Sequence, residues 1–476
     1  METIIDSDGK WMAFLPELET SDCEKMLIET ERKCIILENV AVGEVWIAGG
    51  QSNMEFYMRY EKHIKEEYQC CPNKKLRFYD VPEVCYEGQI YEFDYSRMGI
   101  WRTATVENID YFSAVSYYFQ KELEEDLNIP IGIVGCNWGG SRAYAWMNQE
   151  TLKEVGALWL NDFEDIIAHM DLEAYWKKQH GNPVNDQGNP FANPLNELLL
   201  PRTPTKEEIN EFFKMDFTKI NQERMGKGKS ILPILFPGCL YEKMLKMIVP
   251  FSIRGFLWYQ GESDDVPGRQ VLYENMLTGL ISDWRKLWHQ EEIPFLIVQL
   301  PGWEHWIDSE NQDFATIRRC QEHVADKVKN VYLCSISDAG ERNNIHPKNK
   351  KIVGHRLALL ARGHIYGEHL LCDAPRIRQI LREKNSMVIS FMHVEGGLKV
   401  DGNHINALKV KQGSHELPFS FTVSGENIVL IFETEIKGSV NVEFAQDKWF
   451  LVNLYNQADI PAIPFSICCE KEGIYK

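Results

Sequence analysis

The chain has 476 residues, more than one compact core normally holds, so its length predicts two or three domains. Lys and Arg total 51 against 70 for Asp and Glu, which gives a formal net charge of −19 at pH 7. A chain this acidic is not expected to bind nucleic acid or an anionic membrane, because both need a positively charged face. Hydrophobic residues at 44% and charged residues at 25% indicate a globular protein rather than a disordered one.

Targeting and cysteine patterns predict an intracellular setting. The first residues lack the basic start and apolar run of a secretory signal, and no apolar stretch is long enough to span a bilayer. The 12 cysteines include no Cys-x-x-Cys pair, which favours free thiols in a reducing compartment over a disulfide framework or a zinc knuckle. We therefore expect a soluble cytoplasmic protein without a membrane partner.

Apolar runs and helical patterns alternate along much of the chain. The predicted strands are residues 45–48, 131–134, 253–258, 295–300 and 331–336, and the predicted helices are 111–127, 272–287, 314–328 and 350–361. Such alternation is typical of a doubly wound parallel sheet covered by helices on both faces. We expect this α/β domain over residues 41–370.

Three other regions have a different texture. Residues 160–237 lose the periodicity, apart from one short helix predicted at 206–213, and an ordered excursion of this length usually forms a lid or pocket wall. Residues 371–476 contain β runs separated by Gly-containing turns, which predict an all-β domain. Short β stretches in residues 1–40 are expected to pack with that C-terminal β region.

The turn after the first strand reads Gly-Gly-Gln-Ser-Asn-Met at residues 49–54. Sites of such sheets lie beyond the carboxyl ends of the strands, so polar side chains there are candidates for function. Ser52 would stand at the start of the next helix, where free backbone N–H groups could stabilise a developing oxyanion. The alternative is that Ser52 only caps this helix, which is the commoner role of serine at that place.

Three further segments at strand ends carry polar residues. The turn at 135–142 contains a glycine pair, which could bring a backbone N–H to a substrate oxygen or simply form a tight turn. The turn at 258–263 reads Trp-Tyr-Gln-Gly-Glu-Ser, where Gln260 could donate to an oxyanion, although an ordinary polar loop is the simpler interpretation. The loop at 338–350 contains His346, which could act as general base, although a single histidine is more often structural.

Taken together and in this order, the motifs are specific. Gly-Gln-Ser-Asn-Met at 50–54, Trp-Gly-Gly-Ser at 138–141, Trp-Tyr-Gln-Gly-Glu at 258–262 and Ile-His-Pro-Lys-Asn-Lys at 345–350 closely resemble the blocks of the sialate O-acetylesterase family. These are carbohydrate esterases of the SGNH hydrolase type. With weaker similarity in the segments 101–115 and 453–465, the resemblance covers nearly the whole chain. It implies a flavodoxin-like, doubly wound sheet with a satellite all-β domain.

The resemblance also implies roles for the matching residues. Ser52 would be the acyl nucleophile and His346 its base, while the N–H groups of Ser52 and Gly140 (or Gly139) and the side chain of Gln260 would form the oxyanion hole. Hydrolysis through an acetyl-enzyme would then need no metal and no cofactor. The residues expected to bind substrate or support the site are Gln51, Asn53, Glu262, Arg142 and Trp258.

One departure from the family pattern concerns the group that orients the histidine. An aspartate commonly stands two or three residues before it, but here those positions are Asn344 and Asn343. An amide can accept a hydrogen bond from the imidazole yet lacks the charge that stabilises an imidazolium. Asp338 is the candidate third member, with Glu341 or a Ser–His dyad as the alternatives.

The leading hypothesis is therefore a serine O-acetylesterase acting on a small acetylated sugar. O-acetylated sialic acid comes first by resemblance, and acetylated xylo- or manno-oligosaccharides are alternatives. The net charge does not favour an anionic sialate unless a local arginine offsets it. A carbohydrate-binding protein that kept the fold without turnover is a further alternative. A homo-oligomer remains open.

Overall fold

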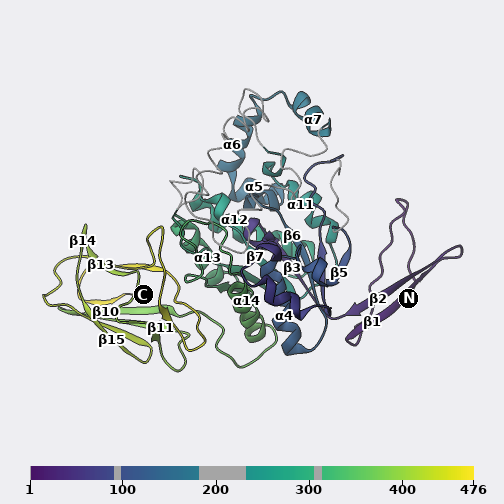
Figure 1. The fold of residues 1–476 in the computed structure, drawn as a ribbon. Helices are drawn as coiled ribbons and strands as arrows, with labels where there is room; N and C mark the ends of the chain where they lie inside the picture. The colour runs from purple at the N-terminus through teal and green to yellow at the C-terminus, as the bar shows by residue number, and fades with distance from the viewer. Residues whose placement is uncertain (1, 90–97, 182–231, 305–312, 476) are drawn as a thin grey trace.

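The computed structural model describes residues 2–89, 98–181, 232–304 and 313–475, and the statements below concern these ranges. An α/β body lies between an N-terminal hairpin on one side and a C-terminal β domain on the other (Figure 1). Within these ranges no helix has the length and apolar character needed to cross a membrane. The helix predicted at 206–213 lies outside the described residues, as does most of the excursion at 160–237.

The central sheet contains the five predicted strands in a doubly wound order. They are β3 (Glu44–Gly50), β6 (Ile131–Asn137), β7 (Gly255–Tyr259), β8 (Phe295–Val298) and β9 (Val331–Cys334). They pair in parallel in the order β6-β3-β7-β8-β9. Numbered along the chain this order is 2-1-3-4-5, which puts the topological switch point, and hence the expected site, at the end of β3.

Two strands were not predicted, and they make the sheet mixed rather than purely parallel. β4 (Asn73–Asp80) pairs in parallel with β6, and β5 (Trp101–Ala104) pairs antiparallel with β4 at the edge of the sheet. β4 carries Lys75 and Arg77 among its apolar residues, and β5 is only four residues long, so neither reads as a buried apolar run.

Helices cover both faces of this sheet. They are α4 (Ala114–Leu127), α12 (Tyr273–Leu287), α13 (Ala315–Lys327) and α14 (Lys351–His364), each within four residues of a predicted helix. Helix α4 packs on α14, and α12 packs on α13. Right-handed crossovers place these two pairs on opposite faces. Helix α4 begins later than predicted because Ser113 is its cap, accepting a hydrogen bond from Ser116 N at 3.2 Å.

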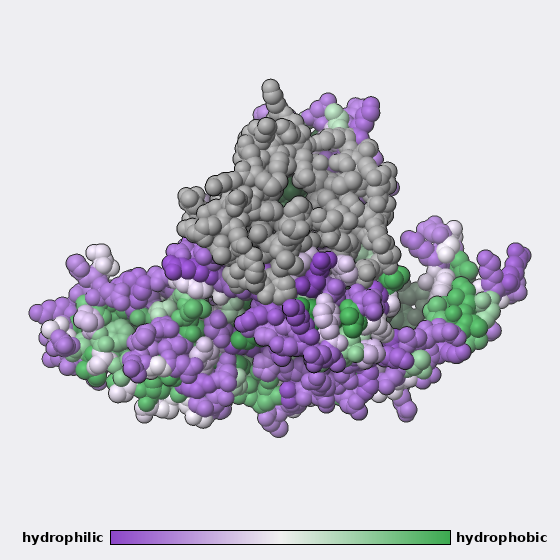
Figure 2. Space-filling view, viewed as in Figure 1, coloured by the Kyte–Doolittle hydropathy of each residue, from purple (hydrophilic) through white to green (hydrophobic). Residues whose placement is uncertain are grey.

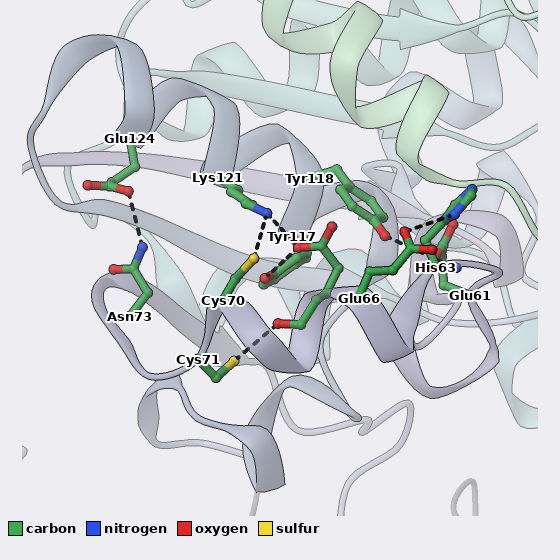
Figure 3. Close-up of polar contacts among 11 residues, drawn as sticks. Glu61, His63, Glu66, Cys70, Cys71, Asn73, Tyr117, Tyr118, Lys121 and Glu124 are labelled. Carbon is green, nitrogen blue, oxygen red and sulfur yellow. Dashed lines mark hydrogen bonds and ion pairs between the residues drawn. The ribbon is translucent and has the colours of Figure 1, made fainter.

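The segment that follows the first turn is held against α4 by polar contacts (Figure 3). Tyr118 donates to Glu61 Oε2 at 2.9 Å. Glu67 Oε2 accepts from Tyr117 at 3.2 Å and from Lys121 Nζ at 2.6 Å. Because these carboxylates lie 9 and 15 residues beyond Ser52 in sequence, the contacts fix the chain that leaves the candidate site.

The N-terminal hairpin corrects one prediction. β1 (Ser21–Glu29) pairs only with β2 (Cys34–Val42), and Arg77 of β4 donates to the carbonyls of Asp22 and Asn39 at 2.9 and 3.1 Å. The hairpin therefore lies beside the β4–β5 edge, on the side away from the C-terminal β domain (Figure 1). The expectation that residues 1–40 pack with that domain is wrong for the hairpin, because β2 runs through a single residue into β3 and Arg77 holds both hairpin strands beside β4.

Figure 2 shows exposed apolar surface over the hairpin and also in patches over the C-terminal β domain, separated by hydrophilic surface. Leu27, Ile35 and Ile36 are each more than half exposed.

The C-terminal region is an all-β domain with its own apolar core. One antiparallel sheet has the order β15-β16-β11-β10-β20 and a second has the order β14-β13-β17-β19. The bounds are β10 (Arg376–Arg382), β11 (Ser386–Met392), β13 (Leu408–Gln412), β14 (His415–Glu416), β15 (Ser420–Ser424), β16 (Asn427–Ile431), β17 (Val440–Phe444), β19 (Phe465–Cys469) and β20 (Gly473–Tyr475). A short pair, β12 (Lys399–Val400) and β18 (Leu454–Tyr455), adds to them.

Candidate active site

Ser52 and His346 meet at the carboxyl end of β3. The imidazole Nε2 of His346 lies 2.8 Å from Ser52 Oγ, although the two residues are 294 positions apart in the chain. Both residues are half-buried. This is the distance and atom pairing that a general base needs to take a proton from a serine hydroxyl.

The turn that presents Ser52 is set by Gly50 and Gln51. Gly50 has φ +140°, and a Cβ there would lie 2.2 Å from Tyr259 O, so the position needs glycine. Gln51 N donates to Tyr259 O at 3.1 Å, and Gln51 Oε1 accepts from Ser263 N at 3.2 Å. The β3 turn is thereby tied to the turn after β7.

Ser52 is not a helix cap in this structure. Helix α1 (Ser52–Glu55) is a single turn whose cap position is Gln51, with no side-chain cap hydrogen bond. Ser52 is its first helical residue, so its backbone N–H has no partner within the helix. Ser52 therefore does not cap this helix, and its hydroxyl instead points to His346.

The glycine pair after β6 lies directly beside Ser52. A Cβ on Gly139 would be 3.3 Å from Ser52 Cβ, which leaves little room for a side chain, and Gly140 has φ +76°, a backbone conformation that favours glycine. Gly139 N donates to Glu55 Oε2 at 2.6 Å, which occupies that N–H. Gly140 is exposed, so its N–H is the better placed of the two to donate to a substrate oxygen.

Glu55 is a residue that sequence reasoning missed. It stands three positions after Ser52 on one helical turn, a spacing that places both on the same side, and this was the available signal. Burial and neighbouring Asp80 raise the pKa of Glu55 to about 7 against the hydrogen bond from Gly139. Burial likewise raises the pKa of Asp80 to about 7, opposed by Arg102, and raises that of Glu83.

Gln260 does not have the role the motif implied. Its side chain is fully buried, and its Nε2 donates to Asp264 Oδ2 and to Ser141 O, the latter at 3.3 Å. Its Oε1 accepts from Tyr273 OH at 2.9 Å. Both amide hydrogens are thus used inside the protein, and Gln260 ties the β7 turn to the glycine turn instead of facing an oxyanion.

Asp338 also lies elsewhere than expected. Its two carboxylate oxygens accept from Arg356 NH1 and NH2 at 2.6 and 2.8 Å, in an almost fully buried bidentate pair between the loop and α14. This geometry does not support Asp338 as the group that orients His346. Asn344 Oδ1 holds the backbone N–H of His346 at 2.9 Å, and Asn344 Nδ2 donates to Glu341 at 3.3 Å.

A buried polar network supports the loop from below. Asn53 Nδ2 donates to Glu262 Oε1 at 2.6 Å and to Ile345 O at 2.9 Å, and Asn53 Oδ1 accepts from Lys350 Nζ. Of the residues expected to bind substrate or support the site, Gln51, Asn53 and Glu262 form hydrogen bonds within the protein, and none is more than 4% exposed. Lys350, unassigned from the sequence although its motif was recognised, is fully buried.

The charges around His346 keep its imidazole neutral. Burial, together with the cations of Lys350 and Lys348, lowers the pKa of His346 to about 3. Burial also lowers the pKa of Lys350 to about 7, opposed by Glu262, Glu341 and Glu61. A histidine that stays unprotonated at neutral pH is available as a base.

Trp258 and Arg142, both expected near the substrate, lie in different surroundings. Trp258, expected to bind substrate or support the site, is fully buried and packs edge-to-face on Trp146 and Trp284, so it cannot contact a sugar. Arg142 is half-buried just past the glycine pair, with its guanidinium 4.5 Å from the Trp159 ring centroid and its Nε donating to Ser263 O. It remains a candidate substrate contact.

The described residues contain one group of side chains that could hold a metal: His364, Cys372 and Asp373. The sequence analysis expected none. This group lies at the far end of α14, about 20 Å from Lys350 at 1.5 Å per residue. It is therefore separate from Ser52 and His346.

Comparison with known proteins confirms the resemblance drawn from the motifs. A family model described as "Carbohydrate esterase, sialic acid-specific acetylesterase" matches residues 225–361, a stretch that includes His346 but not Ser52. The sialate O-acetylesterase of Mus musculus is 24% identical over 396 residues, covering 77% of this chain and 65% of that protein. The Homo sapiens enzyme is 24% identical over 386 residues, covering 75% and 61%. The chain thus spans a little under two thirds of these relatives.

A solved structure supports the fold. The crystal structure of a carbohydrate acetylesterase from Xanthomonas citri aligns with a TM-score of 0.71 over 97% of this chain and 89% of that one, at 24% identity. The α/β body with an additional β domain is therefore an arrangement already seen among carbohydrate esterases.

Proposed function

We propose that this chain, similar to the sialate O-acetylesterases over three quarters of its length, is a serine O-acetylesterase of the SGNH hydrolase type. The carrying observation is the 2.8 Å contact between Ser52 Oγ and His346 Nε2. Its place at the switch point of a 2-1-3-4-5 sheet, beside a glycine turn, supports the same reading.

The reaction follows from this geometry in two halves. His346 Nε2 takes the Ser52 proton as Oγ attacks the acetyl carbonyl, and the N–H groups of Ser52 and Gly140 receive the oxyanion. The tetrahedral intermediate collapses, His346 returns the proton to the departing sugar oxygen, and the acetyl group stays on Ser52. Water, deprotonated by His346, then releases acetate and restores the serine.

The loop that carries His346 supports it through its backbone. Asn344 holds its backbone, and the Asn53–Lys350–Glu262 network fixes the neighbouring carbonyl of Ile345. We propose that this frame positions His346 as the base that acts on Ser52. The nearby cations make the imidazolium less stable, which favours rapid return of the proton to the leaving group.

We propose a small O-acetylated sugar as substrate, in keeping with the printed names of the relatives. Sialate is the first candidate, and Arg142 is the cation that could receive its carboxylate beside Ser52. Acetylated xylo- and manno-oligosaccharides are the alternatives. Twelve cysteines, all free, support our proposal of a reducing, cytoplasmic site of action.

The test is acetate release by wild type, Ser52→Ala and the control Ser386→Ala. Ser386 is a serine of the C-terminal β domain whose hydroxyl donates to Glu383. Nitrophenyl acetate reports the chemistry, and mass loss from acetylated sialic acids and oligosaccharides reports the substrate. We expect activity in wild type and Ser386→Ala but none in Ser52→Ala. Equal release by Ser52→Ala would refute the nucleophile, and sugar binding without any release would favour a non-catalytic binder.

A further inference from the structure

A mixed set of metal-ligating side chains gathers where α14 ends and the chain passes into the C-terminal β domain. His364 Nε2 lies 3.0 Å from each carboxylate oxygen of Asp373. Cys372 Sγ lies 3.9 Å from Asp373 Oδ2, and the three donor atoms all fall within 4.8 Å of one another. His393, just past β11, places its Nδ1 3.9 Å from the same Asp373 oxygen.

These separations fit a single ion at the centre of the group. Bonds of about 2.0–2.3 Å in a tetrahedral zinc site put neighbouring donor atoms roughly 3.3–3.8 Å apart. The His364–Asp373 and Cys372–Asp373 separations of 3.0 and 3.9 Å bracket that range. His393 Nδ1 lies 3.9 Å from Asp373 Oδ2 but outside the group whose donor atoms are all within 4.8 Å of one another, so its side chain would have to turn toward the ion to complete the site. Thiolate and imidazole ligands select zinc and similar ions over magnesium or calcium.

The surrounding structure prepares the ligand positions without help from an ion. The fully buried Asn456 donates from Nδ2 to the carbonyls of Asp373 and His393 at 2.9 and 3.1 Å, which holds two ligand backbones together. The Tyr332 ring stacks on His364 with centroids 4.0 Å apart. A Cβ on Gly363 would lie 2.5 Å from Cys372 Sγ, so that glycine leaves room for the sulfur.

We infer that His364, Cys372, Asp373 and His393 form a structural binding site for Zn²⁺ or a chemically similar divalent ion at the junction of the two domains. Four protein ligands would close the coordination sphere, which is the pattern of structural rather than catalytic zinc. The ion would join the end of α14, the linker and the end of β11. The competing explanation is an ordinary ion pair between His364 and Asp373, in which Cys372 and His393 would bind no ion.

Cobalt titration of the full chain distinguishes the two. Chelator-treated protein receives Co²⁺, and visible and near-ultraviolet absorption report tetrahedral geometry and cobalt–thiolate bonding; Zn²⁺ is then added to displace it. We expect one equivalent to bind with a thiolate charge-transfer band, and excess Zn²⁺ to raise Tm by a few degrees. The variants Cys372→Ser and His393→Ala should lose the band and the Tm rise.

The matched control is Cys468→Ser, which removes an exposed thiol of the same β domain and should leave both signals intact. Circular dichroism of each ion-free variant checks that it is folded, and His393 is exposed enough to be replaced safely, with 40% of its side chain accessible. The inference is overturned if Co²⁺ binds without a thiolate band. It is equally overturned if the band survives Cys372→Ser or disappears with Cys468→Ser.

Discussion

Replacing Glu55 with glutamine separates the hydrogen bond of this side chain from its charge. The folded protein raises the pKa of Glu55 from its usual 4.5 to about 7, chiefly through burial. Between these two values the folded state keeps the proton while the unfolded chain releases it. Stability contributed by the protonated carboxyl is therefore fully present below pH 4.5 and is lost as the pH rises through about 7.

The size of the effect follows from the same two values. At about 1.4 kcal/mol per pKa unit, the rise from 4.5 to about 7 corresponds to about 3 kcal/mol of stability lost by pH 8. Glu55→Gln cannot ionise, so at pH 8 it should exceed wild type by up to about 3 kcal/mol. At pH 4.5 the two proteins should be nearly equal.

The assay is urea unfolding at pH 4.5 and pH 8, with Glu150→Gln as control, because Glu150 is an exposed carboxylate paired with Lys153. Kinetics give a second readout. The glutamine carbonyl can still accept from Gly139 N, so kcat should change only a few-fold, whereas Glu55→Ala frees the glycine turn and should lower kcat about 10²-fold. A Glu55→Gln effect of the same size at both pH values would refute this reasoning.

Three further predictions follow from the site. Gln260→Ala should lower the free energy of unfolding, measured in urea, by about 3–5 kcal/mol, because Ser141 O, Asp264 and Tyr273 would lose their hydrogen bonds inside the protein. The control Gln299→Ala, at an equally buried position, should cost less. A 10²-fold loss of kcat with unchanged stability would instead support the oxyanion role of Gln260. Asp338→Asn should lower the free energy of unfolding by about 3–5 kcal/mol, because it leaves the buried Arg356 guanidinium without its carboxylate. At a temperature where the variant is folded, kcat should fall less than tenfold. A loss of 10³-fold or more would show that Asp338 is a member of the catalytic triad. The pH profile of kcat/KM should stay flat to about pH 4 and fall toward pH 3 as His346 gains a proton, whereas an acid limb near pH 6–7 would contradict its low pKa.

The sheet and the Ser52–His346 pair could be predicted because their signals are local. Each of the five strands is an apolar run ending in a glycine-containing or polar turn, and the order of motifs places their ends together. β4 escaped because charged residues interrupt it: Arg77 contacts Asp22 and Asn39 of the hairpin, and Lys75 contacts Asn128. A strand of that kind has no apolar period to detect.

The errors at the site share one cause, which is that a motif fixes residue type but not side-chain direction. Gln260 and Trp258 belong to a recognised sequence motif, yet both side chains point into the protein. There Gln260 donates to Asp264, and Trp258 packs on Trp284. Asp338 is a carboxylate close to His346 in sequence, but it forms an ion pair with Arg356 of α14 instead. Such long-range competition for a carboxylate leaves no trace in local spacing.

Arg356 has a consequence for the modular status of the C-terminal domain. Besides Asp338, its guanidinium donates to Asp459 O of that domain at 3.0 Å, and Trp303 N donates to Lys448 O at 3.0 Å. One cation thus fastens the loop leading to His346 to a strand connection more than a hundred residues downstream. A truncation after residue 370 would remove the Arg356–Asp459 contact, which helps to hold the loop that carries His346. The β domain therefore stabilises the reaction centre, and neither evolution nor engineering can exchange it freely.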